Sequence, residues 1–260
     1  MSLAEKPRKR RRGLAAFIVI LVVVVLAVVA FFVGDALARQ YATGVIQKQM
    51  AKAAGTTSPK DVHVSFGTGS FLIQYLTGDI QHVSVNISPV TAAGITGSLK
   101  IRATDVPTDL DKPVGTLRVG VVVPVTSLSA KVATVPQLKS LGVRVKPAGT
   151  NLQFSGILAV FGQKIPIGVT ATPHVVAGKP GLSLDKILLG QNTIPVSQFE
   201  TVVPGLANVL KSGASLCIAS SLPKEFVLTG VAVVGQDLTF TLNGDGAKLN
   251  DASLSQKGTC

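Results

Sequence analysis

The feature that most constrains this chain is an unbroken run of 20 apolar residues near its start, residues 14–33. A helix of that length rises about 30 Å, which is the thickness of the hydrocarbon core of a membrane. Six basic residues and one acidic residue precede the run, and Asp35 follows it. The positive-inside rule therefore predicts a basic cytoplasmic tail over residues 1–13, a transmembrane signal-anchor over residues 14–34 and an extracytoplasmic domain over residues 35–260.

Two other interpretations of this N-terminal region compete with the anchor. The motif Ala36-Leu37-Ala38 resembles the A-x-A site of a cleaved signal peptide. The apolar run is longer than the ~7 to 15 residues usual in such peptides, so an uncleaved anchor is favoured. The basic cluster also suggests a nucleic-acid-binding arm. Because the cluster abuts the apolar run without a linker, it is better interpreted as a topogenic signal, and nucleic acid is not an expected partner.

Composition narrows the class of the exported domain. Hydrophobic residues make up 47% of the chain, and 25 basic against 13 acidic residues give a net charge of +12, so intrinsic disorder is excluded. Two cysteines, three histidines and no tryptophan argue against a disulfide-dense scaffold, a zinc cluster protein and a multi-metal enzyme. We therefore expect one globular domain with no cofactor.

Hydrophobic spacing predicts one helix followed by many strands. Residues 35–54 have apolar side chains at helical spacing and Gly55 as a stop, which predicts an amphipathic helix that leads away from the membrane. Its apolar stripe consists of Leu37, Tyr41, Val45, Ile46, Met50 and Ala53. Beyond it, apolar and polar residues alternate, which predicts nine or ten half-buried strands. The alternating segments are residues 62–66, 82–87, 99–103, 117–123, 143–145, 152–154, 165–169, 182–184, 227–233 and 238–242.

Further helix and turn signals complete the predicted architecture. The segment Ser197-Gln198-Phe199-Glu200 fits a capping box, and it predicts a second helix to Leu210 that Pro204 should kink. A short turn is expected over residues 135–141, and a tight hairpin at Gly235-Gln236-Asp237. Strands with one polar face are typical of antiparallel sheets, so a Rossmann or barrel enzyme is not expected. The predicted class is α+β, with a large curved antiparallel sheet and two covering helices.

The sequence contains no recognised catalytic motif, so we do not expect an enzyme. It has no G-x-S-x-G, P-loop, H-E-x-x-H or G-x-G-x-x-G pattern. The D-x-D match at residues 109–111 lies between two prolines, where a solvated loop is the better interpretation. Catalysis would require a histidine with a nucleophile, or at least two acidic residues, to converge in one pocket. The residues concerned are His63, His82, His174, Asp79, Asp105, Asp109, Asp185 and Glu200.

The cysteines and the basic strand residues have two interpretations each. In an oxidising compartment, Cys217 and Cys260 are expected to form a disulfide that closes a loop of 44 residues, and two free thiols are the alternative.

Several basic residues occupy the polar phase of strands, where they form either a solvated face or an electropositive face directed at anionic lipid. These residues are Lys100, Arg102, Arg118, Arg144 and Lys146.

One segment carries a family resemblance. The sequence Phe71-Leu72-Ile73-Gln74-Tyr75-Leu76-Thr77-Gly78-Asp79-Ile80, then Val83-Ser84-Val85, follows a membrane-proximal helix that begins at Asp35. Together with Leu228-Thr229-Gly230-Val231 and Leu238-Thr239-Phe240, it resembles the actinobacterial LmeA-like phospholipid-binding family over residues 35–254.

The resemblance implies a membrane-tethered periplasmic protein that binds anionic phospholipid of the phosphatidylinositol type. It also implies a role in the assembly of the lipoglycans lipomannan and lipoarabinomannan, with envelope glycosyltransferases as partners. The sheet and helices would form an apolar groove of the tubular lipid-binding kind, in which each buried CH₂ contributes about 0.8 kcal/mol. The candidate groove lip is Phe71, Leu72, Tyr75 and Leu76, against the alternative that these residues are ordinary core. A structural adaptor for biosynthetic enzymes and an envelope lipid or glycan hydrolase or transferase remain the alternative functions.

Overall fold

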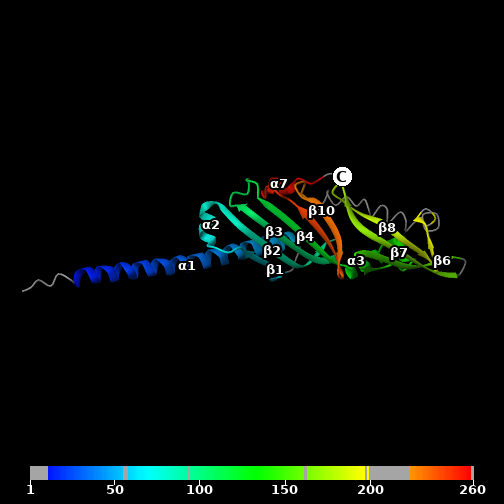
Figure 1. The fold of residues 1–260 in the computed structure, drawn as a ribbon, viewed down its shortest axis with the longest axis horizontal. Helices are drawn as coiled ribbons and strands as arrows, with labels where there is room; N and C mark the ends of the chain where they lie inside the picture. The colour runs from blue at the N-terminus through cyan, green and yellow to red at the C-terminus, as the bar shows by residue number, and fades with distance from the viewer. Residues whose placement is uncertain are drawn as a thin grey trace, which may run out of the picture.

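The chain begins with one long helix that leaves the body of the protein. The computed structural model describes residues 11–54, 58–92, 94–160, 163–196, 198 and 223–258. Helix α1 (Arg11–Ala54) has 44 residues, which corresponds to a length of about 66 Å. It projects from one end of the body before it runs along the first strands (Figure 1). The predicted anchor and the predicted amphipathic helix are therefore one continuous helix, and α1 is the one element of the described residues that is long and apolar enough to cross a membrane.

The face of α1 that packs on the sheet differs from the predicted stripe. Ile46 and Met50 pack against the first two strands, as expected. Leu37 and Tyr41 are 61% and 77% exposed, so the prediction is wrong for the first half of the stripe. The physical reason lies in the polar contacts of this half of the helix, because Asp35 and Arg39 bond to the segment before α2. Leu37 and Tyr41 are each two residues from Arg39, so they lie on nearly the opposite side of α1, which is exposed to solvent.

The strands form two antiparallel sheets. The six-stranded sheet has the order β1-β2-β3-β4-β11-β10, and the five-stranded sheet has the order β5-β6-β7-β8-β9. The strands of the first sheet are β1 (Val62–Phe66), β2 (Asp79–Ala92), β3 (Ile95–Pro107), β4 (Thr116–Pro124), β10 (Val227–Val234) and β11 (Asp237–Asn243). Those of the second are β5 (Arg144–Ala148), β6 (Asn151–Val160), β7 (Gln163–Val176), β8 (Lys179–Leu189) and β9 (Asn192–Ile194).

The predicted class, α+β with a large antiparallel sheet, is confirmed. Each predicted alternating segment overlaps a strand, and Gly235, at a φ of 63°, forms the predicted turn between β10 and β11. Strand β9 was not predicted, because three residues are too few to show alternation. The strands divide into two sheets because α3 (Val125–Val132) and α4 (Pro136–Lys139) separate β4 from β5. Strand β4 pairs instead with β11, from near the end of the chain.

Short helices occupy the ends and connections of the sheets. They are η1 (Pro59–Asp61), α2 (Phe71–Thr77), α3, α4 and α7 (Asp251–Ser255). The predicted turn over residues 135–141 is confirmed as α4, with Gly142 in the left-handed region at a φ of 58°. The predicted helix of residues 197–210 lies, apart from Gln198, outside the described residues, so that second covering helix stays a prediction.

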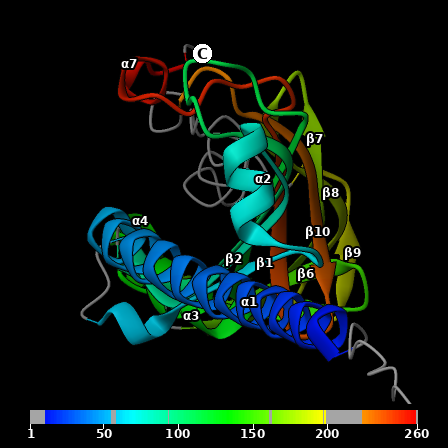
Figure 2. The ribbon, with the colours of Figure 1, turned by 90° about the vertical axis from the view of Figure 1, so that its left-hand side faces the viewer.

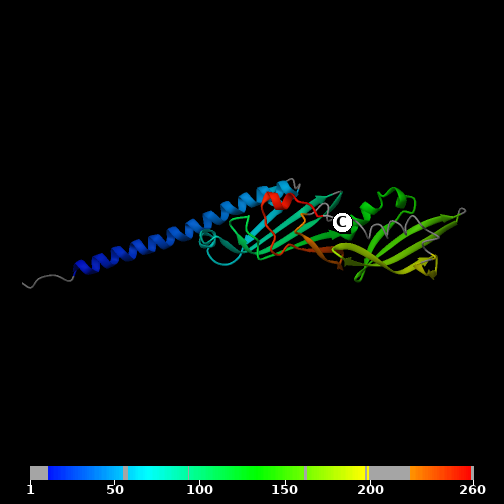
Figure 3. The ribbon, with the colours of Figure 1, turned by 90° about the horizontal axis from the view of Figure 1, so that it is seen from above.

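A shared core joins the two sheets. Its largest cluster brings Val233 and Leu238 of the six-stranded sheet together with Val169 and Ile187 of the five-stranded sheet. The two sheets consequently follow one another along the long axis (Figure 3). Seen along that axis, the strands curve from α1 at one edge toward α7 at the other (Figure 2). This curvature gives the six-stranded sheet one inner face and one outer face.

Candidate functional site

Two rows of apolar side chains cross all six strands of the first sheet. Within each row every residue lies directly opposite its neighbour on the next strand, so the side chains share one face of the sheet. The first row is Val62, Ile87, Leu99, Val121, Phe240 and Val231. The second row is Val64, Val85, Ile101, Val119, Leu242 and Leu228.

Burial varies along the rows, and half-buried residues occur on the edge strands, at Val64 and Val231, as well as on the central strands. Ile87 on β2 is fully buried under α1, and Leu228 and Leu242 on β10 and β11 are also buried. The central residues are only half-buried, although their side chains are entirely apolar. We call this central set the apolar strip, and it consists of Leu99, Ile101, Val119, Val121 and Phe240. Four of these residues, Leu99, Ile101, Val119 and Phe240, pack at one side against the buried core, and their remaining exposed hydrocarbon can be sheltered from water by an apolar ligand.

The sequence analysis did not single out the apolar strip as a binding surface. Alternation correctly placed these side chains on one face, but it gave equal weight to residues such as Ile87 that α1 covers completely. Only the pairing of β4 with both β3 and β11 brings Leu99, Val121 and Phe240 side by side.

Helix α2 is held beside the point where α1 leaves the apolar run. One carboxylate oxygen of Asp35 accepts hydrogen bonds of 2.7 Å from the Ser70 hydroxyl and 2.7 Å from the Leu72 backbone N–H. The Leu72 bond, followed by the Ser70 bond, lowers the pKa of Asp35. Arg39, one turn further along α1, donates to the carbonyls of Gly67 at 3.3 Å and Gly69 at 2.6 Å. These contacts fix the start of α2 on α1.

The sequence of α2 also sets its ends. The Ser70 hydroxyl caps the first turn by accepting a bond of 3.2 Å from the Ile73 N–H. Gly78 ends the helix in the left-handed conformation, at a φ of 86°, which a residue with a Cβ adopts only at a cost. Helix α2 is thus limited to two turns by a cap at each end, and its side chains face either the sheet or solvent.

The four predicted lip residues divide between core and surface. Phe71 is 6% exposed, and its ring centroid lies 4.7 Å from that of Phe66, so the core interpretation fits this residue. Leu72 is half-buried. Tyr75 and Leu76 are 56% and 76% exposed, and the neighbouring Ile73, which the prediction omitted, is 52% exposed. The helical spacing of Ile73 and Leu76 was the signal that could have identified it.

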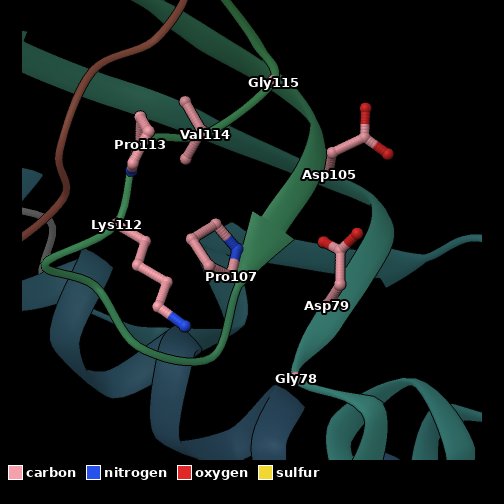
Figure 4. Close-up of a pocket in the computed structure, with 8 residues that line it drawn as sticks. All are labelled: Gly78, Asp79, Asp105, Pro107, Lys112, Pro113, Val114 and Gly115. Carbon is pink, nitrogen blue, oxygen red and sulfur yellow. The ribbon is translucent and has the colours of Figure 1, made fainter.

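An open pocket of about 440 Å³ lies where α2 joins β2. Asp79 and Asp105 project from neighbouring strands on one side of it, and Lys112 lies on the other side (Figure 4). Asp105 has a φ of 50°, and Gly115 approaches it so closely that a Cβ there would lie 2.7 Å from the Asp105 carboxylate. The pocket is lined by Gly78, Asp79, Asp105, Pro107, Lys112, Pro113, Val114 and Gly115.

Two of the five candidate acids therefore meet in one pocket. Asp109 lies in the loop after β3, where its carboxylate accepts a hydrogen bond from the Asp111 N–H. Asp185 is on the other sheet and accepts a hydrogen bond from the Thr172 hydroxyl. Glu200 lies outside the described residues. Across the part of the chain that the structure describes, no group of three His, Cys, Asp or Glu residues could hold a metal ion.

Three of the five basic strand residues lie on the face opposite the apolar strip, and the other two, Arg144 and Lys146, are on β5 of the five-stranded sheet. Lys100, Arg102 and Arg118 are exposed and alternate along β3 and β4 with the strip residues, and Arg102 is directly opposite Arg118. These cations therefore cannot contact the headgroup of a lipid whose tails lie on the strip. A second open pocket, of about 620 Å³, gathers other cations near the start of the five-stranded sheet, namely Lys139, Arg144 and Lys164.

Comparison with known proteins returned one match. A sequence model of the family described as LmeA-like phospholipid-binding matches residues 33–243, which is more than half of the chain. No curated protein and no solved structure matches the chain. The predicted cysteine pair, Cys217 and Cys260, lies outside the described residues, so the disulfide stays a prediction.

Proposed function

This chain belongs to the LmeA-like phospholipid-binding family, and from that premise we propose that it is a membrane-tethered lipid carrier whose apolar strip shelters the acyl chains of a phospholipid. The observation that carries the proposal is the pair of apolar rows that remain half-buried in the middle of the sheet, at Leu99, Ile101, Val119, Val121 and Phe240. The matched region includes every one of these residues.

The physical basis is transfer of hydrocarbon from water to an apolar wall. Each fully sheltered CH₂ group contributes about 0.8 kcal/mol, so about five such groups contribute about 4 kcal/mol. The apolar strip runs from β3 through β4 to β11, which is two strand spacings or about 10 Å. An acyl chain laid across the strip would contact apolar side chains over that distance.

The basic tail and the apolar run support the proposed topology. Six basic residues precede residues 14–33, and the positive-inside rule places them in the cytoplasm with the sheets on the extracytoplasmic side. The exposed apolar side chains of α1 between Ile20 and Val33 fit lipid surroundings. A carrier tethered in this way would act close to the membrane that supplies its ligand.

We propose that the lipid is anionic and of the phosphatidylinositol type. We also propose that the protein supports the assembly of lipomannan and lipoarabinomannan, together with envelope glycosyltransferases. Beyond the basic tail the chain has 19 basic and 12 acidic residues, a net charge of +7, which favours an anionic partner. Since Lys100 and Arg102 face away from the strip, the headgroup would have to be held elsewhere. The pocket with Lys139, Arg144 and Lys164 provides three cations without an acidic residue in its lining.

A matched pair of variants tests the strip. Val121 and its neighbour Val122 are both half-buried, but their side chains lie on opposite faces of β4. An amide placed against acyl chains costs about 1–3 kcal/mol, so Val121→Gln should weaken phospholipid binding by at least about fivefold. Val122→Gln should leave it unchanged.

The measurement is native mass spectrometry of the full chain released from detergent micelles, with phosphatidylinositol titrated against phosphatidylcholine. Thermal unfolding of both variants shows whether the fold is kept, and Val121→Phe, which fills the strip without adding polarity, provides a second test. Equal binding by all three variants would refute the strip as the acyl site. Equal affinity for the two lipids would refute the anionic preference.

The pocket with Asp79 and Asp105 is the one observation that favours an enzyme. Two carboxylates on adjacent strands are the minimum for acid–base hydrolysis. Both side chains are exposed, whereas a carboxyl that acts as a general acid is usually placed in apolar surroundings. Incubation of the chain with radiolabelled phosphatidylinositol decides the matter, because a hydrolase would release product and Asp79→Asn with Asp105→Asn would abolish that release.

A further inference from the structure

The end of the body that adjoins the span carries exposed apolar side chains on two separate helices. On α2 these are Ile73, Tyr75 and Leu76, and on α1 they are Leu37 and Tyr41. We call these five residues the membrane-end surface. Soluble faces of helices are normally polar, so apolar side chains on two neighbouring helices need a common explanation.

Both parts of this surface lie at the level where the apolar run ends. Leu37 is one helical turn beyond Val33, the last residue of the run, and Tyr41 is one turn further. Along the helix axis they therefore lie about 6 Å and about 12 Å from Val33. Helix α2 begins beside Asp35, through the two 2.7 Å hydrogen bonds that this carboxylate accepts. A bilayer with its headgroups is about 40–45 Å thick around a core of about 30 Å, so each interfacial layer is about 5–8 Å deep. This layer covers Leu37 and the start of α2, and Tyr41 lies just beyond it on the aqueous side.

The connection between span and surface is rigid. Helix α1 continues without interruption from the apolar run through Asp35 and Arg39. Arg39 adds bonds to the carbonyls of Gly67 and Gly69, so the segment before α2 is held at several points. Figures 1 and 3 show α2 as the first part of the body after α1 emerges, running across the long axis and not along it. A helix in this orientation lies roughly parallel to the membrane plane when α1 crosses it.

We propose that the membrane-end surface is seated in the boundary between headgroups and acyl chains of the bilayer that α1 spans. The inference rests on the proposed tethering of the chain in a membrane. Leu76 and Ile73 enter the acyl region, and Tyr75 occupies the headgroup level, where tyrosine is enriched in membrane proteins. Tyr41 lies at the aqueous edge of that level. The continuity of the surface with the apolar run identifies the occupant as lipid of that same membrane.

Seating this surface gives the sheet a fixed position on the bilayer. Strand β2 starts at Asp79, directly after α2, and β3 ends opposite it at Pro107. One end of the six-stranded sheet is thereby held at the membrane surface, and the strands lead from there toward the apolar strip. A lipid leaving the bilayer would then meet protein without crossing open water.

Tryptophan fluorescence tests the proposal directly, because the chain has no tryptophan of its own. The test variant is Leu76→Trp and the matched control is Val234→Trp, at a side chain that is 62% exposed. Val234 pairs with Asp237, and Asp237 lies opposite Pro124 at the last residue of β4. The first residue of β4, Thr116, pairs with Thr104 near the membrane end, and the two ends of β4 are about 25 Å apart. The control position is therefore far from the proposed membrane contact. The full chain is reconstituted in phosphatidylcholine vesicles that contain phosphatidylinositol, with or without brominated acyl chains.

The proposal predicts that brominated lipid quenches the tryptophan of Leu76→Trp severalfold more than that of Val234→Trp, and that aqueous acrylamide quenches it severalfold less. Equal quenching of both variants in vesicle-bound protein would refute the seating of α2 and leave the tether intact. A chain that does not float with vesicles in a density gradient would refute the tether itself, and with it this inference. Phospholipid binding by native mass spectrometry is measured separately, so loss of the carrier function is distinguished from both.

Discussion

Replacing Phe71 by alanine should loosen α2 far more than replacing Leu76, although both were candidates for the same lip. Phe71 is buried and packs against the ring of Phe66 at 4.7 Å between centroids. Truncation of a buried Phe to Ala costs about 3–5 kcal/mol, and the short α2 at the end of the sheet suggests the lower value, about 3 kcal/mol. Leu76 is exposed, so Leu76→Ala should change the free energy of unfolding by less than about 0.5 kcal/mol.

Hydrogen exchange of the full chain in detergent micelles measures the difference. Since each 1.4 kcal/mol is a factor of ten, a loss of about 3 kcal/mol raises the exchange of the amides in residues 71–77 by about a hundredfold. If the loss is shared by the whole domain, Tm falls by about 6–12 °C, at about 2–4 °C for each kcal/mol. The variant Phe71→Leu, which keeps most of the apolar volume, should show a smaller effect.

Equal exchange in Phe71→Ala and Leu76→Ala, with Tm unchanged in both, would refute this reasoning. It would mean that the ring of Phe71 does not hold α2 on the sheet. An effect in Leu76→Ala as large as that in Phe71→Ala would instead mean that the Leu76 side chain helps to hold α2 on the sheet, which its exposed fraction within the protein contradicts.

Three further outcomes are expected. The pKa of Asp35 is held below its ordinary value of 3.8, chiefly by the backbone hydrogen bond it accepts, so its support of α2 is complete above pH 3.8 and is lost as the pH falls through the lowered pKa. Exchange of α2 followed between about pH 5 and about pH 2 should show this step, and Asp35→Asn should remove it. Gly97→Ala should destabilise the chain by at least about 1 kcal/mol, because a Cβ at this position would clash with the Val122 carbonyl oxygen of β4. Gly120→Ala is the control, since a Cβ there meets no atom closer than 3.8 Å. Thermal unfolding of the two variants measures the difference. Peptide mass spectrometry without reduction should find Cys217 linked to Cys260, and detection of either thiol in free form would contradict the predicted disulfide, which is worth about 4 kcal/mol.

The local patterns of the sequence predicted the elements of the fold well. Alternation identified strands such as β2 and β4 and also which residues share a face, because a strand's side chains alternate whatever it pairs with. Length and hydropathy identified the part of α1 that is long and apolar enough to cross a membrane for a similar reason, since an apolar run is a property of the segment alone. Gly142 and Gly235 marked turns because each adopts a positive φ.

The candidate site depended on contacts that no local pattern contains. The stripe from Leu37 to Ile46 satisfied helical spacing equally well along its whole length, but Asp35 and Arg39 bond to the segment before α2, and Leu37 on the other side of α1 stays exposed. The convergence of Asp79 and Asp105 likewise follows from the register of β2 with β3. Periodicity reports which faces are apolar, and not which of them a neighbour covers.

The sequence by itself thus determined a helix long and apolar enough to span a membrane, a β-rich domain after it and the apolar face of each strand. The tertiary structure decided how the strands divide into two sheets, how β4 joins β11, and which apolar side chains stay half-buried on the strip or exposed on α1 and α2. The physical reason is that periodicity and hydropathy are properties of short segments. Coverage depends on the packing free energy between residues that are distant in the chain, and it is fixed only when the segments are brought together.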